Sequence, residues 1–117
     1  MAITHTFAGL PVADYTHAYD WYEHLLARGA DMFPHESECV WQLTPTSSIY
    51  VVQDPQRAGS ALVTLALDDL DAYERRLREV GLTFRKEASG TAPRRLVVSD
   101  IDGNRITFFQ SPSPPGD

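Results

Sequence analysis

The amino-acid sequence predicts an α+β fold: two tandem βαβββ modules whose curved mixed sheets enclose a cavity, with the helices outside. Patterns typical of one strand, one helix and three more strands follow one another along residues 1–57, and the same order returns along residues 58–110. The halves also align as written, because Val-Ala-Asp-Tyr at 12–15 matches Leu-Asp-Asp-Leu at 67–70. One helix cannot cover both faces of a sheet, so we expect a single domain in which two modules share a cavity.

The first module begins with a strand pattern over residues 3–12. Asp14 is a good helix-capping residue, and the apolar residues that follow it at helical spacing predict a helix that ends before Gly29. Three short strands are expected after this helix, around residues 32–33, 39–43 and 49–53.

The second module repeats this order from a strand at residues 61–67. Asp68 or Asp69 is expected to cap the second helix, which should end before Gly81. The three strands that follow are expected at residues 82–86, 94–99 and 105–110.

A hairpin turn is predicted at Asp102-Gly103, because Gly takes positive φ freely and Asp tolerates left-handed backbone. The strand after this turn matches the last strand of the first module, since Ile-Tyr-Val-Val-Gln at 49–53 aligns with Ile-Thr-Phe-Phe-Gln at 106–110. The Pro- and Ser-rich residues 111–117 contain no packing side chains, so a flexible tail is expected there.

Composition excludes several classes of partner. The chain has 117 residues and a net charge of −6, which disfavours nucleic acid or an anionic membrane as the partner. The apolar runs are too short for a membrane span, and the first residues do not resemble a secretion signal. Cys39 is the only cysteine, so no internal disulfide can form. A cytoplasmic location is expected.

Three segments carry a resemblance to a known family. They are Leu-Pro-Val-Ala-Asp at 10–14 with Trp-Tyr-Glu-His-Leu-Leu at 21–26, Leu-Asp-Asp-Leu-Asp-Ala at 67–72, and the hairpin Asp-Ile-Asp-Gly-Asn-Arg-Ile at 100–106. Together with the repeat, they resemble the vicinal oxygen chelate superfamily, which includes glyoxalase I, extradiol dioxygenases, fosfomycin-resistance enzymes and bleomycin-resistance binding proteins. The resemblance implies the paired-module fold and a homodimer, and leaves several functions open.

The resemblance also implies where a metal would be held in the enzymes of this superfamily. Their ligands come from the first and last strand of each module, typically His or Gln and Glu. Aligning the segments puts Phe7, Tyr50, Leu62 and Thr107 at these places, and none of them is a good metal ligand. No cofactor is therefore expected. The alternative is a divalent metal such as Zn, Ni, Mn or Fe, held through His5 if the alignment of the first strand slips by two residues.

An aromatic cavity is the remaining candidate site. Trp41 and Tyr50 are expected as the first ligand contacts, because each offers a large ring and one polar group. For any single ring, packing in the core is the competing interpretation. The candidate ligand-binding residues are His5, Phe7, Phe33, Trp41, Tyr50, Leu62, Thr64, Thr107 and Phe109.

The favoured function is binding of an aromatic or amphipathic small molecule without a metal, as in the bleomycin-resistance type. One alternative is a metal-dependent lyase or dioxygenase of the same superfamily. A second is a metal-free enzyme that uses His5 or Tyr50 for acid/base chemistry, because an imidazole titrates near working pH. The catalytic residue is not identified by the sequence, and His5 is the candidate, because it would hold the metal in the first alternative and transfer a proton in the second.

Overall fold

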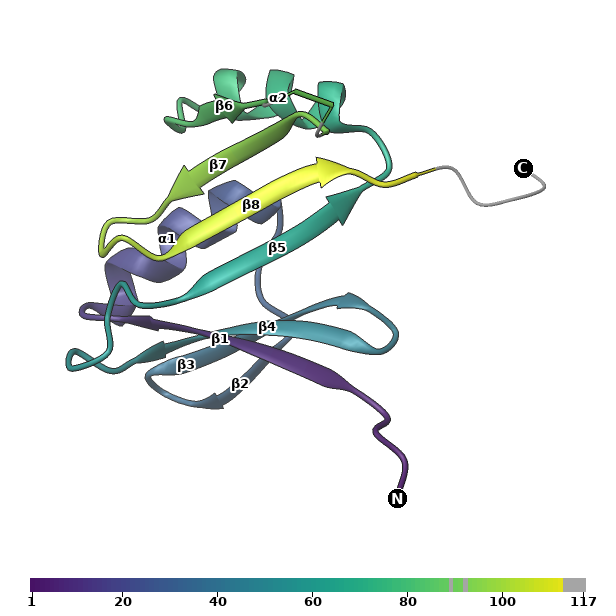
Figure 1. The fold of residues 1–117 in the computed structure, drawn as a ribbon. Helices are drawn as coiled ribbons and strands as arrows, with labels where there is room; N and C mark the ends of the chain where they lie inside the picture. The colour runs from purple at the N-terminus through teal and green to yellow at the C-terminus, as the bar shows by residue number, and fades with distance from the viewer. Residues whose placement is uncertain (89, 92, 113–117) are drawn as a thin grey trace. The chain divides into compact units, whose positions relative to one another are not determined.

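The protein divides into two compact units in a computed structural model that describes residues 1–88, 90, 91 and 93–112 (Figure 1). The first unit is Met1–Ala61 together with Asp100–Asn104, and the second is Leu62–Ser99 together with the chain from Arg105 onward. Most of the predicted flexible tail, residues 113–117, lies outside the described residues. Neither helix of the described chain is long and apolar enough to span a membrane.

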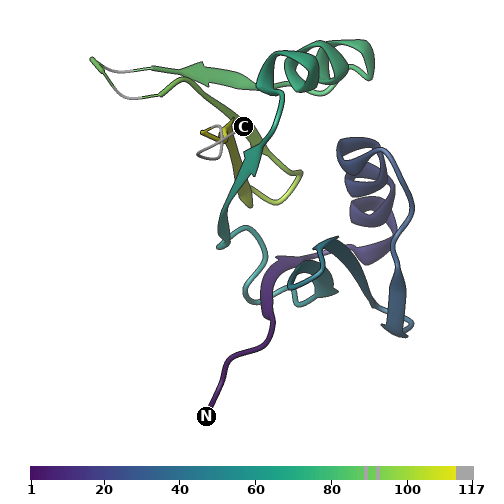
Figure 2. The same ribbon diagram turned by 90° about the vertical axis from the view of Figure 1, so that its right-hand side faces the viewer.

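The first unit is a four-stranded sheet with one helix lying over one side of its strands (Figure 2). The strands run in the order β1-β4-β3-β2, with β1 parallel to β4 and the other neighbours antiparallel. Its elements are β1 (Thr6–Val12), α1 (Tyr15–Leu26), β2 (Met32–His35), β3 (Glu38–Thr44) and β4 (Ser47–Gln53).

The second unit has the same architecture, with strands in the order β5-β8-β7-β6 and β5 parallel to β8. Its elements are β5 (Leu62–Leu67), α2 (Leu70–Glu79), β6 (Arg85–Glu87), β7 (Arg95–Ser99) and β8 (Arg105–Gln110). The repeated βαβββ order is therefore confirmed. Each sheet is open and has two edges, so the closure around a cavity that the repeat predicts is not seen in either unit by itself.

The two units repeat each other down to single hydrogen bonds at the helix starts. Gln53, at the end of β4, accepts a hydrogen bond from the backbone N–H of Tyr15, and Gln110, at the end of β8, accepts one from Leu70. The first N–H groups of a helix have no partner within the helix, so a strand-end amide is well placed to satisfy them.

Aspartate caps complete both helix starts. Asp14 accepts from the N–H of His17, and Asp69 accepts from the N–H of Ala72. Asp69 is thus the cap of α2, and Asp68 is not. Each cap supplies a side-chain oxygen to a backbone donor three residues on, which is the usual N-cap arrangement.

The helix ends differ from one another. Gly81 follows α2 with φ +77, and the N–H of Leu82 donates to the carbonyl of Leu77, which closes a Schellman motif. Leu82 therefore belongs to this cap, and β6 begins at Arg85 instead of residue 82 as predicted. In the first unit the left-handed residue is Ala27, with φ +66, and not Gly29 as the sequence suggests.

The early end of α1 coincides with contacts made by the next residue. The carbonyl of Arg28 accepts a hydrogen bond of 3.0 Å from Trp41 Nε1, and its guanidinium donates to the carbonyl of Gln42 and to Asp31. These contacts to β3 and to the following loop offset the strain of a left-handed alanine.

The core of each unit lies between its helix and the facing side of its sheet. In the first unit the buried side chains are Leu10, Val12, Ala18, Tyr22, Leu25, Cys39, Trp41, Ile49 and Val51. In the second they are Leu70, Leu77, Leu96, Val98, Ile106 and Phe108. These apolar contacts leave the opposite face of each sheet without a helix.

The turn at residues 100–104 is held by the buried carboxylate of Asp100. One oxygen accepts from the N–H groups of Asp102, Gly103 and Asn104, each at 2.9 Å. The other accepts from the Tyr22 hydroxyl at 2.7 Å and from the Asn104 side chain at 2.8 Å. Burial and the neighbouring carboxylate of Asp100 raise the pKa of Tyr22, so its hydroxyl stays a donor. The predicted turn is confirmed, and its acidic residue fixes it to α1.

Removing the Asp100 carboxylate should destabilise the protein. Asp100→Ala leaves several buried donors without an acceptor, so we expect the free energy of unfolding to fall by about 3 kcal/mol or more. Urea denaturation measures this loss. Asp20→Ala, at an exposed position of α1, is the control, and equal stability of the two variants would contradict this role of Asp100.

A cluster of charges ties α2 to the strands of the second unit. Glu74 lies within ion-pair distance of Arg78 (2.8 Å), Lys86 (2.9 Å) and Arg94 (2.6 Å). Arg94 also pairs with Asp71. The hydrogen bonds from Arg78 and Lys86 lower the pKa of Glu74 from 4.5 to about 2.

This shift makes stability depend on acidity. A carboxyl with a lowered pKa in the folded state stabilises the protein above its ordinary pKa, and the stabilisation is lost as pH falls from 4.5 toward 2. Glu74→Gln should therefore flatten the pH dependence of the unfolding temperature across this window. A profile that keeps the wild-type slope in the variant would show that another group is responsible.

Candidate functional site

The uncovered face of the first sheet carries the best candidate site. Strand register places Phe7 opposite Ser48 and Gly9 opposite Tyr50, and all four lie on the face away from α1. Phe7 lies near the start of the edge strand β1 and is 55 % exposed, so this face presents a large apolar ring to solvent. We refer to this surface as the open face of the first sheet.

His5 lies at one end of the open face, just before β1. Its Nε2 atom is 3.0 Å from the hydroxyl oxygen of Ser48, and its ring stacks on Phe7 with a centroid distance of 4.5 Å. Either atom of the His5–Ser48 pair can act as the donor. The pair therefore offers one polar group beside an exposed aromatic ring, which is a common arrangement in ligand sites.

The ring of Tyr50 is half-buried and reaches across β1. Its Cζ and hydroxyl oxygen lie 2.6 Å from the point where a Cβ of Gly9 would stand. Within the described part of the chain the Tyr50 hydroxyl makes no hydrogen bond. Its oxygen is thus available to a ligand.

Trp41 and Phe33 do not share this face. Trp41 is fully buried, stacks on Tyr19 of α1 with a centroid distance of 5.6 Å, and points to the helix side of the sheet. Phe33 also lies beside Tyr19, at 5.9 Å. The prediction that paired Trp41 with Tyr50 as first contacts is corrected here: adjacent β3 and β4 place Trp41 opposite Ile49, on the covered face.

The open face of the second sheet gathers the other candidates. Thr64 pairs with Thr107, and Phe109 lies two residues farther along β8 on the same side, opposite Ala66. Leu62, at the start of β5, is 77 % exposed. All four residues predicted in the second module, Leu62, Thr64, Thr107 and Phe109, therefore share one face of their own sheet.

The side chains present do not suit a divalent metal. The positions that the superfamily resemblance assigns to metal ligands hold a phenyl ring, a phenol, an aliphatic chain and a hydroxyl, namely Phe7, Tyr50, Leu62 and Thr107. His5 adds one imidazole, but Ser48 is its polar neighbour and a hydroxyl binds divalent cations weakly. Among the described residues no group of three His, Cys, Asp or Glu side chains could hold a metal ion.

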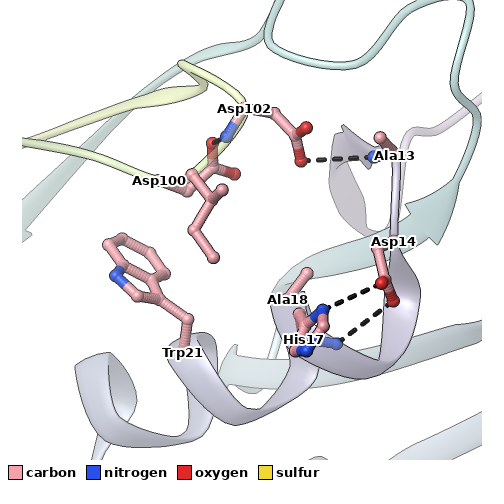
Figure 3. A pocket seen from close by; sticks show the side chains of 8 residues that line it. Ala13, Asp14, His17, Ala18, Trp21, Asp100 and Asp102 are labelled. Atoms are coloured by element: carbon pink, nitrogen blue, oxygen red, sulfur yellow. Dashed lines mark hydrogen bonds and ion pairs between the residues drawn. The ribbon is translucent and has the colours of Figure 1, made fainter.

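A small pocket on the helix side of the first unit was not predicted (Figure 3). Its volume is about 240 Å³, and it is lined by Ala13, Asp14, His17, Ala18, Trp21, Asp100, Ile101 and Asp102. Asp14 hydrogen-bonds His17 at 2.8 Å, and Asp102 accepts from the N–H of Ala13 at 3.2 Å, as the dashed lines in Figure 3 show. The carboxylates that line this pocket already cap α1 and hold the turn, so the pocket is a weaker candidate for ligand binding than the open face.

Two residues of the open face were missed by sequence reasoning. Ser48 and Gly9 are small and carry no motif, and only the pairing of β1 with β4 brings them beside Phe7 and Tyr50. The alternation of side chains along a strand could have found them, because residues 5, 7 and 9 point to one side of their strand, and residues 48 and 50 point to one side of theirs.

Comparison with solved structures finds close relatives of the whole chain. A glyoxalase/bleomycin resistance protein from Catenulispora acidiphila is 37 % identical, with a TM-score of 0.87, and the match covers 92 % of this chain and 98 % of that one. TnmS3, an antibiotic binding protein from Streptomyces, is 28 % identical, with a TM-score of 0.76 and coverage of 96 % and 99 %. Neither models of protein families nor curated protein sequences give a match.

A bleomycin-binding protein whose structure contains bleomycin shares the fold. It is 20 % identical, with a TM-score of 0.68, and the match covers 96 % of this chain and all of that one. At this identity the likeness concerns the fold alone.

The two tryptophans should differ in their access to solvent. In Trp21→Phe the remaining Trp41 is buried under α1, so acrylamide should quench its fluorescence weakly. In Trp41→Phe the remaining Trp21 lines the helix-side pocket and should be quenched readily. Circular dichroism confirms that both variants fold, and strong quenching of Trp41 would contradict its place on the covered face.

Proposed function

This chain belongs to the glyoxalase/bleomycin resistance protein family, and on that premise we propose that it binds an aromatic or amphipathic small molecule without a metal. The observation that carries the proposal is the open face of the first sheet. There the exposed phenyl ring of Phe7 and the phenol of Tyr50 lie on adjacent strands, and the imidazole of His5 stacks on Phe7 from just before β1. The Tyr50 hydroxyl has no partner among the described residues. TnmS3, which shares the fold at 28 % identity, is an antibiotic binding protein, and this supports the same class of function here.

Each part of the open face has a task in this proposal. An aromatic ligand covers Phe7 and the ring of Tyr50, and each ring-to-ring contact contributes about 0.5–1.5 kcal/mol beyond the burial of apolar area. His5 and Ser48 orient the ligand through one hydrogen bond at the edge of the stack. In this proposal no covalent bond is made or broken, so the protein acts by sequestering its ligand. The ligand is an antibiotic or a molecule of similar chemistry.

An exposed apolar side chain also supports a homodimer as part of this proposal. Leu62, at 77 % exposure, is costly to leave in water, and a second copy of the chain can cover it.

Isothermal titration calorimetry with bleomycin, in buffer treated with a chelator, tests the binding function. We expect saturable binding that Phe7→Ala and Tyr50→Ala each weaken by about tenfold, because each loses an aromatic contact. Phe33→Ala is the matched control, since it removes an exposed ring from the covered side of the same sheet.

Three outcomes would count against the proposal. The first is the absence of saturable binding by the wild type. The second is an equal loss in the Phe33→Ala control. The third is consumption of the ligand, detected by mass spectrometry of the recovered compound, which would favour the acid/base alternative built on His5.

A further inference from the structure

We infer that Gly9 is a specificity-determining residue: its missing side chain lets the Tyr50 ring lie across β1, and this shapes the open face for a planar aromatic ligand that hydrogen-bonds the Tyr50 hydroxyl. The inference rests on the proposed function and adds to it the class of ligand and the residue that selects it. Gly9 makes no contact through a side chain, so a search for binding groups in the sequence passes over it.

The geometry of the pair carries this inference. Gly9 and Tyr50 are directly opposite one another in the parallel pairing of β1 with β4. A Cβ on residue 9 would lie 2.6 Å from both Cζ and the hydroxyl oxygen of Tyr50, and 3.0 Å from Cε2. The two 2.6 Å distances are shorter than real Cβ contacts, so the ring end occupies the space that a side chain at position 9 would fill. Glycine inside a strand often marks such a close approach.

The second unit gives an internal comparison. Thr64 holds the place in β5 that Gly9 holds in β1, and it pairs with Thr107, which holds the place of Tyr50. Where the first strand has a branched side chain, the partner is small. Where the first strand has glycine, the partner is a large ring. The two positions are therefore complementary in size within each unit.

The ring position sets what the surface can bind. With its ring lying over Gly9, Tyr50 shares the open face with the two side chains that flank Gly9 on the same side of β1, Phe7 and Pro11. Phe7 and Tyr50 therefore lie on the same face of adjacent strands, and the His5 ring stacks on Phe7. These rings suit a flat aromatic molecule, and the Tyr50 hydroxyl oxygen, which has no partner among the described residues, favours one with a hydrogen-bonding substituent.

A side chain at position 9 would lift this ring without disrupting the fold. The atoms that an added Cβ meets belong to the far end of a flexible side chain, which can rotate away. We therefore expect Gly9→Ala to fold normally and to change the shape of the open face. Gly9 is not among the glycines with positive φ, so alanine suits its backbone conformation.

A double-mutant cycle tests the inference, with anilinonaphthalene sulfonate as a fluorescent aromatic probe in competition with bleomycin. Gly9→Ala should weaken probe binding by about two- to tenfold in the wild-type background. In the Tyr50→Leu background the same substitution should change binding by less than about twofold, because the ring it displaces is gone. Gly29→Ala, in the loop after α1, is the matched control and should leave binding unchanged.

The outcomes separate the two proposals. If the wild type binds neither compound, the proposed function fails and this inference fails with it. If the wild type binds but Gly9→Ala has the same effect in both backgrounds, or no effect in either, the function stands and the inference is overturned.

Nuclear magnetic resonance gives a readout without ligand: the Gly9 Hα signals should be shifted upfield by the overlying ring and should return to ordinary positions in Tyr50→Leu. Ordinary Gly9 shifts in the wild type would also overturn it.

Discussion

The Asp100 carboxylate accepts hydrogen bonds from the Tyr22 hydroxyl and from three consecutive backbone N–H groups, and the first unit depends on this arrangement. Through Tyr22 it holds the turn against α1. The Tyr22 ring in turn lies 6.3 Å from that of Trp41, so the helix is tied to one face of its sheet. Asn104 extends the same network by donating to the carbonyl of Pro11 and accepting from Ala61. With the helix committed to that face, the other face is left to Phe7 and Tyr50.

Much of the fold could be predicted because the sequence contains the same βαβββ pattern in both halves. The helix caps are local features that the sequence displays, and Asp14 and Asp69 hold equivalent places in the two units. The strand-end glutamines and the parallel strand pairs also repeat, although they join residues far apart in the sequence. The errors in element boundaries lie at the ends of the two helices. Ala27 takes the left-handed conformation although Gly29 is nearby, because Arg28 is bound to β3. The start of β6 shifts because Leu82 completes a helix cap.

The candidate site was only partly predictable for a related reason. Parity along one strand correctly grouped His5 with Phe7, but it cannot relate one strand to the next. Trp41 and Tyr50 lie on adjacent strands and point to opposite faces, because Val40 is the residue of β3 that pairs with Tyr50. On the other side of β4, its pairing with β1 brings Gly9 under the Tyr50 ring. Cross-strand register depends on the turn between strands and on which face is buried, so alternation along one strand shows which residues share a face and not which residues meet across strands.

A titration of isotope-labelled protein with bleomycin, followed through the amide signals in chelator-treated buffer, tests the central claim most directly. The account predicts saturable shifts centred on β1 and β4, at Phe7, Gly9 and Tyr50, with the same midpoint at all three positions. Shifts confined to the helix-side pocket around Trp21, or binding that appears only after a divalent metal is added, would contradict it.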